Sequence, residues 1–226
     1  MALLPQLTLS CAILLSGCLT VICITPPNPD PGRPWKRDRI GIFVGYPSMV
    51  ASRLALSAVV LFHACLVVAY PASSCSAKLN GQLFQWNWHT STCLFIIAFI
   101  GAPIRLAAYA GLGRNFTFKL AAPDRLITSG VYRYIQHPSY TGMCIIMTAN
   151  MGLLFRWDAS PACLIPGSVL AMLEGHGYLA SGLFVYLGMH FIITRIYDEE
   201  SMLRETFGVE WEKWHRSTRR LIPGVF

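Results

Sequence analysis

The sequence predicts an all-α integral membrane protein with about five transmembrane helices and a cytosolic helical tail at its C-terminal end. Only 13% of its 226 residues are charged and 54% are hydrophobic, whereas soluble domains carry about 25% charged residues. The charges also gather in short segments between long apolar runs. An apolar run of about 20 residues is what a helix needs to cross a bilayer, so the runs predict the spans.

The N-terminal region, residues 1–112, contains three of the expected spans, at 3–25, 49–70 and 91–112. The first run lacks a basic leader and a small-residue cleavage site, so we expect an anchor rather than a signal peptide. A proline-rich basic loop over residues 26–48 follows it, because closely spaced prolines prevent helix formation.

Two features of the third span stand apart from an ordinary lipid-facing helix. Pro103 interrupts the run, and Arg105 places a charge within it. Proline removes a backbone hydrogen bond, so we expect a kink there. A charge in a span is costly in lipid, so we expect Arg105 to face protein or water.

The C-terminal region, residues 113–226, combines the remaining spans with the polar parts of the chain. A second basic loop covers 113–137, spans are expected at 138–155 and 178–195, and the charged tail covers 196–226. The tail has a helical pattern that breaks at a glycine, Gly208, with aromatic residues on one face.

The segment between the last two expected spans, residues 156–177, is less regular. Its apolar part, 159–173, is too short to cross a bilayer, so we expect an interfacial or re-entrant excursion. Glu174 and His176 could suggest metal or proton chemistry, but the glycines beside them favour an ordinary loop. Since the sequence contains no CxxC pair, we expect no metal site.

The positions of the basic residues predict the orientation. Four Lys or Arg lie in each basic loop and six lie from residue 195 onward. The positive-inside rule then places both loops and the C-terminus in the cytosol and the N-terminus in the lumen. Because the net charge of +7 is divided among these segments, it does not indicate a nucleic-acid partner. Cys75 and Cys163 fall on the lumenal side, where a disulfide between them is possible; most other cysteines lie in apolar runs.

A polar and aromatic stretch, residues 126–142, separates two apolar runs and contains Tyr132, His137 and Tyr140. Pro138 suits the first turn of a helix, whose free backbone N–H groups attract an anionic or polar group. We therefore expect one wall of a ligand site at the membrane surface. The alternative is an interfacial aromatic belt whose histidine bonds a backbone carbonyl.

A second group of candidate site residues lies where the last expected span leaves the membrane. Arg195 and Glu199 are four residues apart and so project from one helix face, with Glu200 beside them. A cationic ligand would account for acidic residues at this boundary, while a snorkelling arginine and a solvated acidic turn are the alternative. In the tail, aromatic residues could form a lid over the site or lie on lipid as an amphipathic helix. These residues are Trp211, Trp214 and Phe226.

The ordered combination of these motifs resembles the isoprenylcysteine carboxyl methyltransferase family. The resemblance runs from about residue 112 to 226 and rests on LGRNF, LITSGVY, HPSYTG, Arg195 followed by Glu199-Glu200, and FG…W…IPG. It implies a multi-pass enzyme of the endoplasmic reticulum membrane, with a cytosolic active site completed by the tail. It implies methyl transfer from S-adenosylmethionine to the carboxylate of a C-terminal prenylated cysteine, on a protein or on a prenylcysteine-like small molecule.

The resemblance also implies roles for individual residues. Arg195 would hold the substrate carboxylate and act in catalysis together with Glu199. The implied cofactor contacts are Asp124, Arg125, Leu126, Ile127, Tyr132, His137, Pro138, Ser139, Tyr140 and Glu199. The sequence departs from the family at Gln136, where arginine is usual, and in the length of the 156–177 excursion.

Three other classes stay open. Phospholipid and small-molecule methyltransferases share the cofactor and a similar acidic motif. Sterol reductases of similar membrane fold have a related C-terminal half but transfer hydride from NADPH. A non-catalytic membrane protein that keeps the fold is the third. Binding of S-adenosylhomocysteine or of NADPH discriminates among them.

Overall fold

The computed structural model describes residues 3–29, 34–35, 37–41, 43–70 and 72–222. Within these ranges the chain forms helices and no strand, apart from one isolated parallel bridge between Ile135 and Arg219. The all-α prediction is therefore confirmed. The helices are α1 (Leu3–Cys23), α2 (Tyr46–Ala69), α3 (Trp88–Phe95), α4 (Ala102–Leu112), α5 (Pro138–Leu153), α6 (Gly167–Leu173), α7 (Gly177–Phe207) and α8 (Val209–Ser217).

Four helical segments of the described chain are long and apolar enough to cross a membrane. They are Leu3–Cys23, Tyr46–Ala69, Trp88–Asn115 and Gly177–Phe207. The fifth expected span corresponds to α5, which has 16 residues and so measures about 24 Å at 1.5 Å per residue. Four of the five expected spans thus have spanning length, and a complete crossing by α5 stays a prediction.

The third span is continuous through α3, a π-helical turn at Ile96–Gly101 and α4. The irregularity expected at Pro103 takes this form, because a π turn accommodates the backbone groups that a proline leaves unpaired. Glycines let α4 and α5 approach closely here. A Cβ atom on Gly142 would lie 2.8 Å from the Gly101 carbonyl oxygen and from the Arg105 amide nitrogen. This contact fixes Arg105 against the start of α5.

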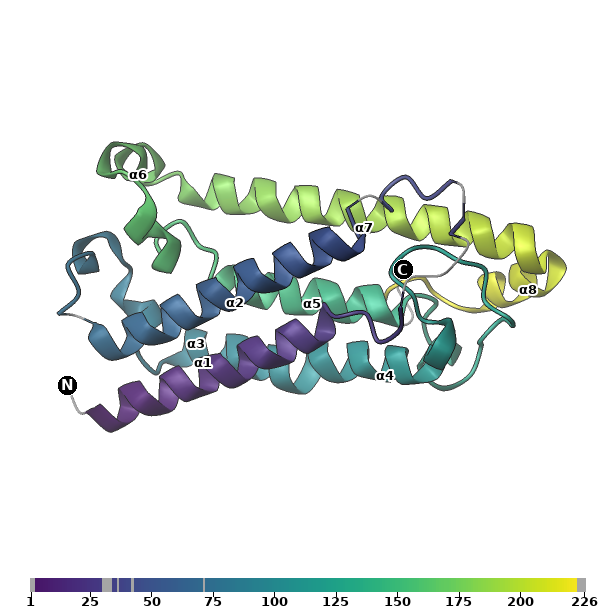
Figure 1. The fold of residues 1–226 in the computed structure, drawn as a ribbon, viewed down its shortest axis with the longest axis horizontal. Coiled ribbons are helices and arrows are strands. Elements are labelled where there is room, and N and C mark those ends of the chain that lie inside the picture. Colours follow the sequence, from purple (N-terminus) through teal and green to yellow (C-terminus); the bar gives the residue numbers. More distant parts are fainter. Residues whose placement is uncertain (1–2, 30–33, 36, 42, 71, 223–226) are drawn as a thin grey trace.

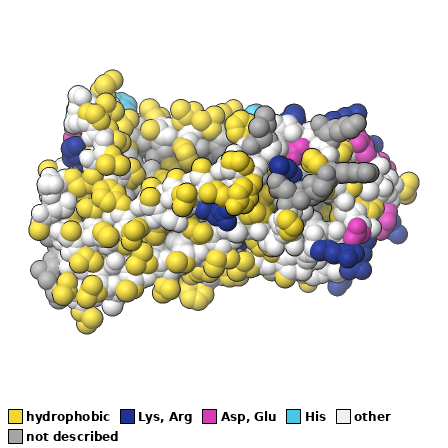
Figure 2. All heavy atoms as spheres, viewed as in Figure 1, with side chains coloured by type: hydrophobic (Ala, Val, Ile, Leu, Met, Phe, Trp, Pro, Cys, Tyr) yellow, Lys and Arg dark blue, Asp and Glu magenta, His cyan; other side chains and the backbone are white. Residues whose placement is uncertain are grey.

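The long helices run side by side, with α6 at one end of the bundle and α8 at the other (Figure 1). Most of the charged side chains visible on one face gather at the α8 end, whereas the flank of the bundle is largely hydrophobic (Figure 2). The break predicted at Gly208 is confirmed: α7 ends at Phe207, and Gly208 adopts a φ of +50° that glycine tolerates readily.

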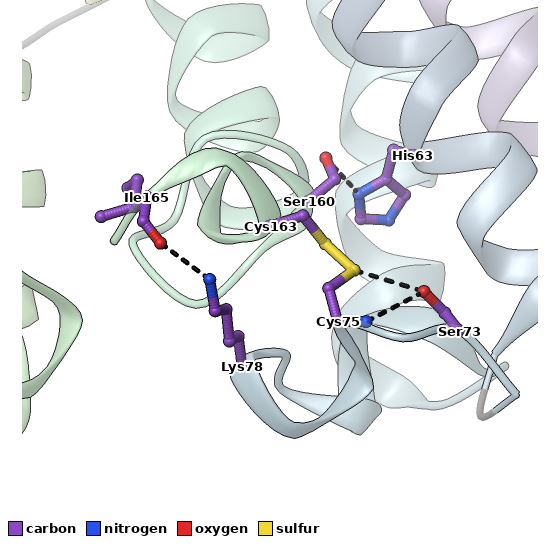
Figure 3. Close-up of a disulfide and its surroundings, with 7 residues drawn as sticks. All are labelled: His63, Ser73, Cys75, Lys78, Ser160, Cys163 and Ile165. Atoms are coloured by element: carbon purple, nitrogen blue, oxygen red, sulfur yellow. Dashed lines mark hydrogen bonds between the residues drawn. A yellow bond between two sulfur atoms is a disulfide. The ribbon is translucent and has the colours of Figure 1, made fainter. Parts of the chain in front are cut away.

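A disulfide joins the loop after α2 to the excursion before α6 at the α6 end of the bundle (Figure 3). Its partners, Cys75 and Cys163, have Cα atoms 5.4 Å apart. Hydrogen bonds flank it: His63 Nδ1 lies 3.2 Å from Ser160 Oγ, and Lys78 Nζ donates to the Ile165 carbonyl over 2.9 Å. The bridge that the sequence left possible is therefore present.

The excursion between α5 and α7 contains a short 3₁₀ helix, Ser160–Leu164, followed by α6. The turn expected at Glu174 and His176 lies between α6 and α7, and Gly175 supplies a φ of +76° within it. The Glu174 carbonyl oxygen lies 3.3 Å from His176 Nδ1. The irregular character of this segment is confirmed, and its depth in a membrane stays a prediction.

Candidate functional site

A cavity of about 580 Å³ lies at the charged end of the bundle. Its walls come from α2 and the segment before it, from α4 and the loop after it, from α5 and α7, and from one residue of α8. Its polar lining includes Arg105, Gln136, His137, Ser139, Tyr140, Arg195 and Glu199. Its apolar lining includes Phe43, Met49, Met143, Met147, Phe184, Leu187 and Phe191. One cavity thus offers charged and apolar surfaces to a ligand.

The order of residues on α5 and α7 explains why one end of the cavity is charged and the other is apolar. Tyr140 Oη donates a 2.7 Å hydrogen bond to Glu199 Oε2 at one end of the contact. Further along both helices, Cys144 Sγ lies 3.7 Å from Met189 Sδ. Since the helices are antiparallel, the polar first turn of α5 meets the polar last turns of α7. The apolar turns of both helices then line the cavity away from that polar end.

The adjacent glutamates of α7 have different environments. Glu199 lines the cavity and accepts from Tyr140. Glu200 is buried and accepts two hydrogen bonds from Arg220, over 2.7 and 2.9 Å. His137 lies between them, with Nε2 at 3.3 Å from Glu200 and Nδ1 at 3.9 Å from Glu199. Glu200 therefore ties the tail to the site, and Glu199 remains available to a ligand.

The guanidinium of Arg195 is buried in an ion pair that spans 157 residues of sequence. Its Nη1 donates to Asp38 Oδ1 and its Nη2 donates to the Phe118 carbonyl oxygen. The side chains of Arg195 and Asp38 are 5% and 6% exposed. Arg195 and Glu199 do share the cavity wall, as their spacing predicts, but the carboxylate bound to Arg195 is that of Asp38. The sequence analysis did not identify Asp38 as a site residue. Its only signal there is an acidic side chain within a basic loop.

A second buried guanidinium, that of Arg105, also lines the cavity. Its Nε donates to the Cys23 carbonyl and its Nη1 to the carbonyl and hydroxyl oxygens of Ser139. Its Cζ lies 4.9 Å from the ring centre of Tyr109. No carboxylate in the described part of the chain pairs with it. The expectation that Arg105 faces protein is confirmed, while its place in the cavity wall was not predicted.

Most residues that the family resemblance implies for the cofactor meet at this cavity. The lining includes Leu126, Ile127, Tyr132, His137, Ser139, Tyr140 and Glu199. Asp124 and Arg125 border a neighbouring hollow of about 430 Å³, which Ile127 also lines. Pro138 is buried at the first turn of α5. The cofactor role of each residue stays a prediction.

The N–H groups at the start of α5 are only partly available. The His137 amide donates to the Arg220 carbonyl oxygen over 2.9 Å, and the Tyr140 amide donates to the His137 carbonyl oxygen over 3.0 Å. The expectation of a helix start with free donors therefore fails for these two groups. Tyr132 keeps its phenolic proton, because burial, with Glu199 adding to it, raises the pKa of the Tyr132 hydroxyl.

The tail docks on the site through Gln136, the position where the sequence departs from the family. Gln136 Nε2 donates to the carbonyls of His215 and Thr218, and its Oε1 lies 2.8 Å from His215 Nδ1. Burial lowers the pKa of His215, so its imidazole is neutral at pH 7. Gln136 thus holds α8 with neutral hydrogen bonds.

Two tryptophans of α8 pack under this contact, as the lid interpretation expects. Trp211 is buried in an apolar cluster with Leu120 and Met202. Trp214 lines the cavity and donates to the Tyr132 carbonyl over 3.2 Å. Phe226, the third expected lid residue, lies outside the described residues. Contact of this tail with lipid stays a prediction.

The fold and cavity define a helical membrane protein whose site joins charged groups to an apolar surface. Residues 93–176 match the isoprenylcysteine carboxyl methyltransferase (ICMT) family. This segment of the chain is therefore similar to that family, and the resemblance expected from the sequence is confirmed. Arg195 and Glu199 lie beyond the matched residues.

Curated relatives agree with this match. Protein-S-isoprenylcysteine O-methyltransferase A of Arabidopsis thaliana is 29% identical over 143 residues, which are 62% of this chain and 62% of the relative. A probable protein-S-isoprenylcysteine O-methyltransferase of Oryza sativa subsp. indica is 28% identical over 61% of this chain and 63% of its own. The Dictyostelium discoideum protein-S-isoprenylcysteine O-methyltransferase is 26% identical over 62% of this chain and 55% of its own. The chain thus covers less than two thirds of the length of these relatives.

Proposed function

We propose that this chain transfers a methyl group from S-adenosylmethionine to the free carboxylate of a prenylated C-terminal cysteine. The observation that carries the proposal is the single cavity whose walls change from charged to apolar along α5 and α7. A prenylcysteine has the same division, with an anionic carboxylate at one end and a hydrocarbon chain at the other. The names of the relatives support the same chemistry.

The charges on the wall fit this pair of ligands. Within the described chain, Glu199 is the one carboxylate of the lining, and Arg105 and Arg195 are its two guanidiniums. S-adenosylmethionine brings an ammonium, a sulfonium and a carboxylate, and the acceptor brings a second carboxylate. Glu199 suits a cationic group, and the two arginines suit the two carboxylates. When bound, the cofactor would supply an electrophilic methyl group.

The residues have little proton transfer to perform in this reaction. A terminal carboxylate has a pKa of about 3.5 and is already ionised at pH 7, so no general base is needed. The protein must align the acceptor oxygen and exclude water from it. Arg195 orients the carboxylate by hydrogen bonding, while the apolar turns of α5 and α7 hold the prenyl chain. Trp214 and the docked tail limit access of water from the α8 end.

We further propose that the site faces the cytosol and that the chain resides in the endoplasmic reticulum membrane. The basic loops and the tail support this orientation through the positive-inside rule. The disulfide between Cys75 and Cys163 supports it independently, since it lies at the opposite end of the bundle, where an oxidising lumen would maintain it.

The test is methyl transfer from tritiated S-adenosylmethionine to N-acetyl-S-farnesylcysteine in membranes that contain the chain. The matched control acceptor is its C-terminal amide, which keeps the prenyl group and lacks the carboxylate. We expect label that is released as volatile methanol by alkali, from the acid only. Absence of that label, with S-adenosylhomocysteine still bound, contradicts the acceptor and favours phospholipid or small-molecule methylation. NADPH binding in place of S-adenosylhomocysteine contradicts the reaction class.

A further inference from the structure

The carboxylate of Asp38 occupies the guanidinium that the proposed function assigns to the substrate. Asp38 Oδ1 accepts from Arg195 Nη1, while the Phe118 carbonyl accepts from Arg195 Nη2. Each terminal nitrogen of Arg195 therefore already donates one of its two N–H groups in this structure. A bidentate grip on another carboxylate would have to use the remaining N–H groups of the same guanidinium, beside the Asp38 carboxylate.

Asp38 is held in place by the backbone around it. Its Oδ2 accepts from the Leu120 amide over 3.0 Å, and its Oδ1 lies 3.3 Å from the Ile40 amide nitrogen. The Trp35 amide also donates to the Leu120 carbonyl, over 2.7 Å. The segment that carries Asp38 thus lies along the loop that forms one cavity wall, and Phe43 of the same region lines the cavity.

Two carboxylates cannot share this buried guanidinium at low cost. The Arg195 and Asp38 side chains are almost fully buried, and charges interact strongly where water is excluded. A substrate carboxylate beside Asp38 would place two negative charges around one positive charge, with full desolvation of all three groups. Binding of one carboxylate to Arg195 therefore opposes binding of the other.

We propose that Asp38 is an internal carboxylate that competes with the substrate carboxylate for Arg195 and thereby sets the affinity of the site for acidic acceptors. This inference rests on the proposed function. Substrate then binds by exchange: Arg195 releases Asp38 and takes the acceptor carboxylate. Neutral acceptors do not gain from this exchange, so Asp38 affects acids and amides differently.

The experiment compares N-acetyl-S-farnesylcysteine with its C-terminal amide as ligands of the full chain in nanodiscs. The dissociation constants of both are measured for wild type, Asp38→Asn and the control Asp198→Asn. Asp198 is a second buried carboxylate and lies on α7. It binds Arg39, a neighbour of Asp38 in the sequence, over 2.7 Å, and it does not line the cavity. Taking the acid-to-amide affinity ratio within each variant removes differences in the folded fraction.

We expect the ratio to rise about tenfold in Asp38→Asn, a change of about 1.4 kcal/mol, and to stay at the wild-type value in Asp198→Asn. An unchanged or lower ratio in Asp38→Asn would make Asp38 a fixed partner of Arg195 and overturn the proposal. An equal rise in Asp198→Asn would also overturn it, because loosening of the segment would then explain the effect.

Methyl transfer separates this inference from the function on which it rests. Methylation with no change of the ratio in Asp38→Asn contradicts the competition alone. A raised ratio without methylation contradicts the proposed reaction alone. A chain that binds neither ligand in any variant contradicts both.

Discussion

The two ends of the bundle join distant segments by different means. At the α6 end, a disulfide joins Cys75 to Cys163 and Asn80 donates to Asp158 over 3.0 Å. At the α8 end, buried ion pairs connect α7 to segments far away in sequence, as between Arg195 and Asp38. Buried ion pairs bring little net stability, because desolvation offsets their attraction. The α6 end is thus held together by a covalent bridge, whereas the proposed function assigns the binding of charged ligands to the α8 end.

The largest effect is expected at the pair that most distinguishes the α8 end. Arg195→Ala should leave Asp38 buried and unpaired, at a cost of about 3–5 kcal/mol of stability. It should also reduce methyl transfer by about 10²- to 10³-fold, since an oriented charge is lost. Thermal unfolding and the transfer rate per folded molecule measure the two effects.

The double variant Arg195→Ala with Asp38→Asn separates stability from activity at this pair. The double variant should regain much of the stability that Arg195→Ala loses, because the unpaired charge is gone. Its transfer rate should stay low. Full activity of Arg195→Ala would contradict a role of the Arg195–Asp38 pair in methyl transfer.

The opposite end should show the reverse pattern. Replacing Cys75 and Cys163 by serine should lower the free energy of unfolding by about 2–4 kcal/mol, because the bridge closes a long loop of 88 residues. The transfer rate per folded molecule should be unchanged, since both cysteines lie away from the cavity. A large loss of that rate, with the folded fraction preserved, would show that the two ends are not independent.

The adjacent glutamates sharpen the comparison within the α8 end. Glu199→Gln should weaken S-adenosylhomocysteine binding by about tenfold to a hundredfold, because a charge-assisted bond contributes about 1.5–3 kcal/mol. Glu200→Gln is the matched control and should mainly weaken tail docking through Arg220. Calorimetric titration of S-adenosylhomocysteine measures both variants. A larger loss of binding in Glu200→Gln would reverse these roles.

The smallest effect concerns the tail. Because burial lowers the pKa of His215, its neutral form stabilises docking, and that contribution is complete above the ordinary pKa of 6.5. As the pH falls below 6.5, protonation should favour the undocked tail. Amide hydrogen exchange of α8, corrected for intrinsic rates, should therefore accelerate at acidic pH. His215→Gln is the control, and the same acceleration in it would exclude His215 as the cause.

Local sequence patterns predicted much of this architecture. Apolar run lengths predicted the long helices, Gly208 the break after α7, and the positions of two cysteines the possible bridge. These features depend on composition and on residues near one another, so the pattern contains them. The 16 residues of α5 were harder to delimit, because the apolar run continues past Leu153 while the helix ends there.

The missed parts of the site depend on contacts between remote segments. Arg195 and Glu199 share a helix face, but Asp38 binds the guanidinium of Arg195 from 157 residues away. Arg105 looked like an isolated charge in a span, and only the close approach of α4 and α5 places it in the cavity wall. Such pairings follow from packing, which a single sequence does not display.

The most direct measurement compares alkali-labile methyl transfer to N-acetyl-S-farnesylcysteine by three forms of the chain at equal folded amounts. The forms are wild type, the variant with serine at both Cys75 and Cys163, and Arg195→Ala with Asp38→Asn. The proposed function predicts activity in the first two forms and a loss of about 10²-fold or more in the third. An inactive wild type that binds no S-adenosylhomocysteine, or a fully active third form, would contradict it.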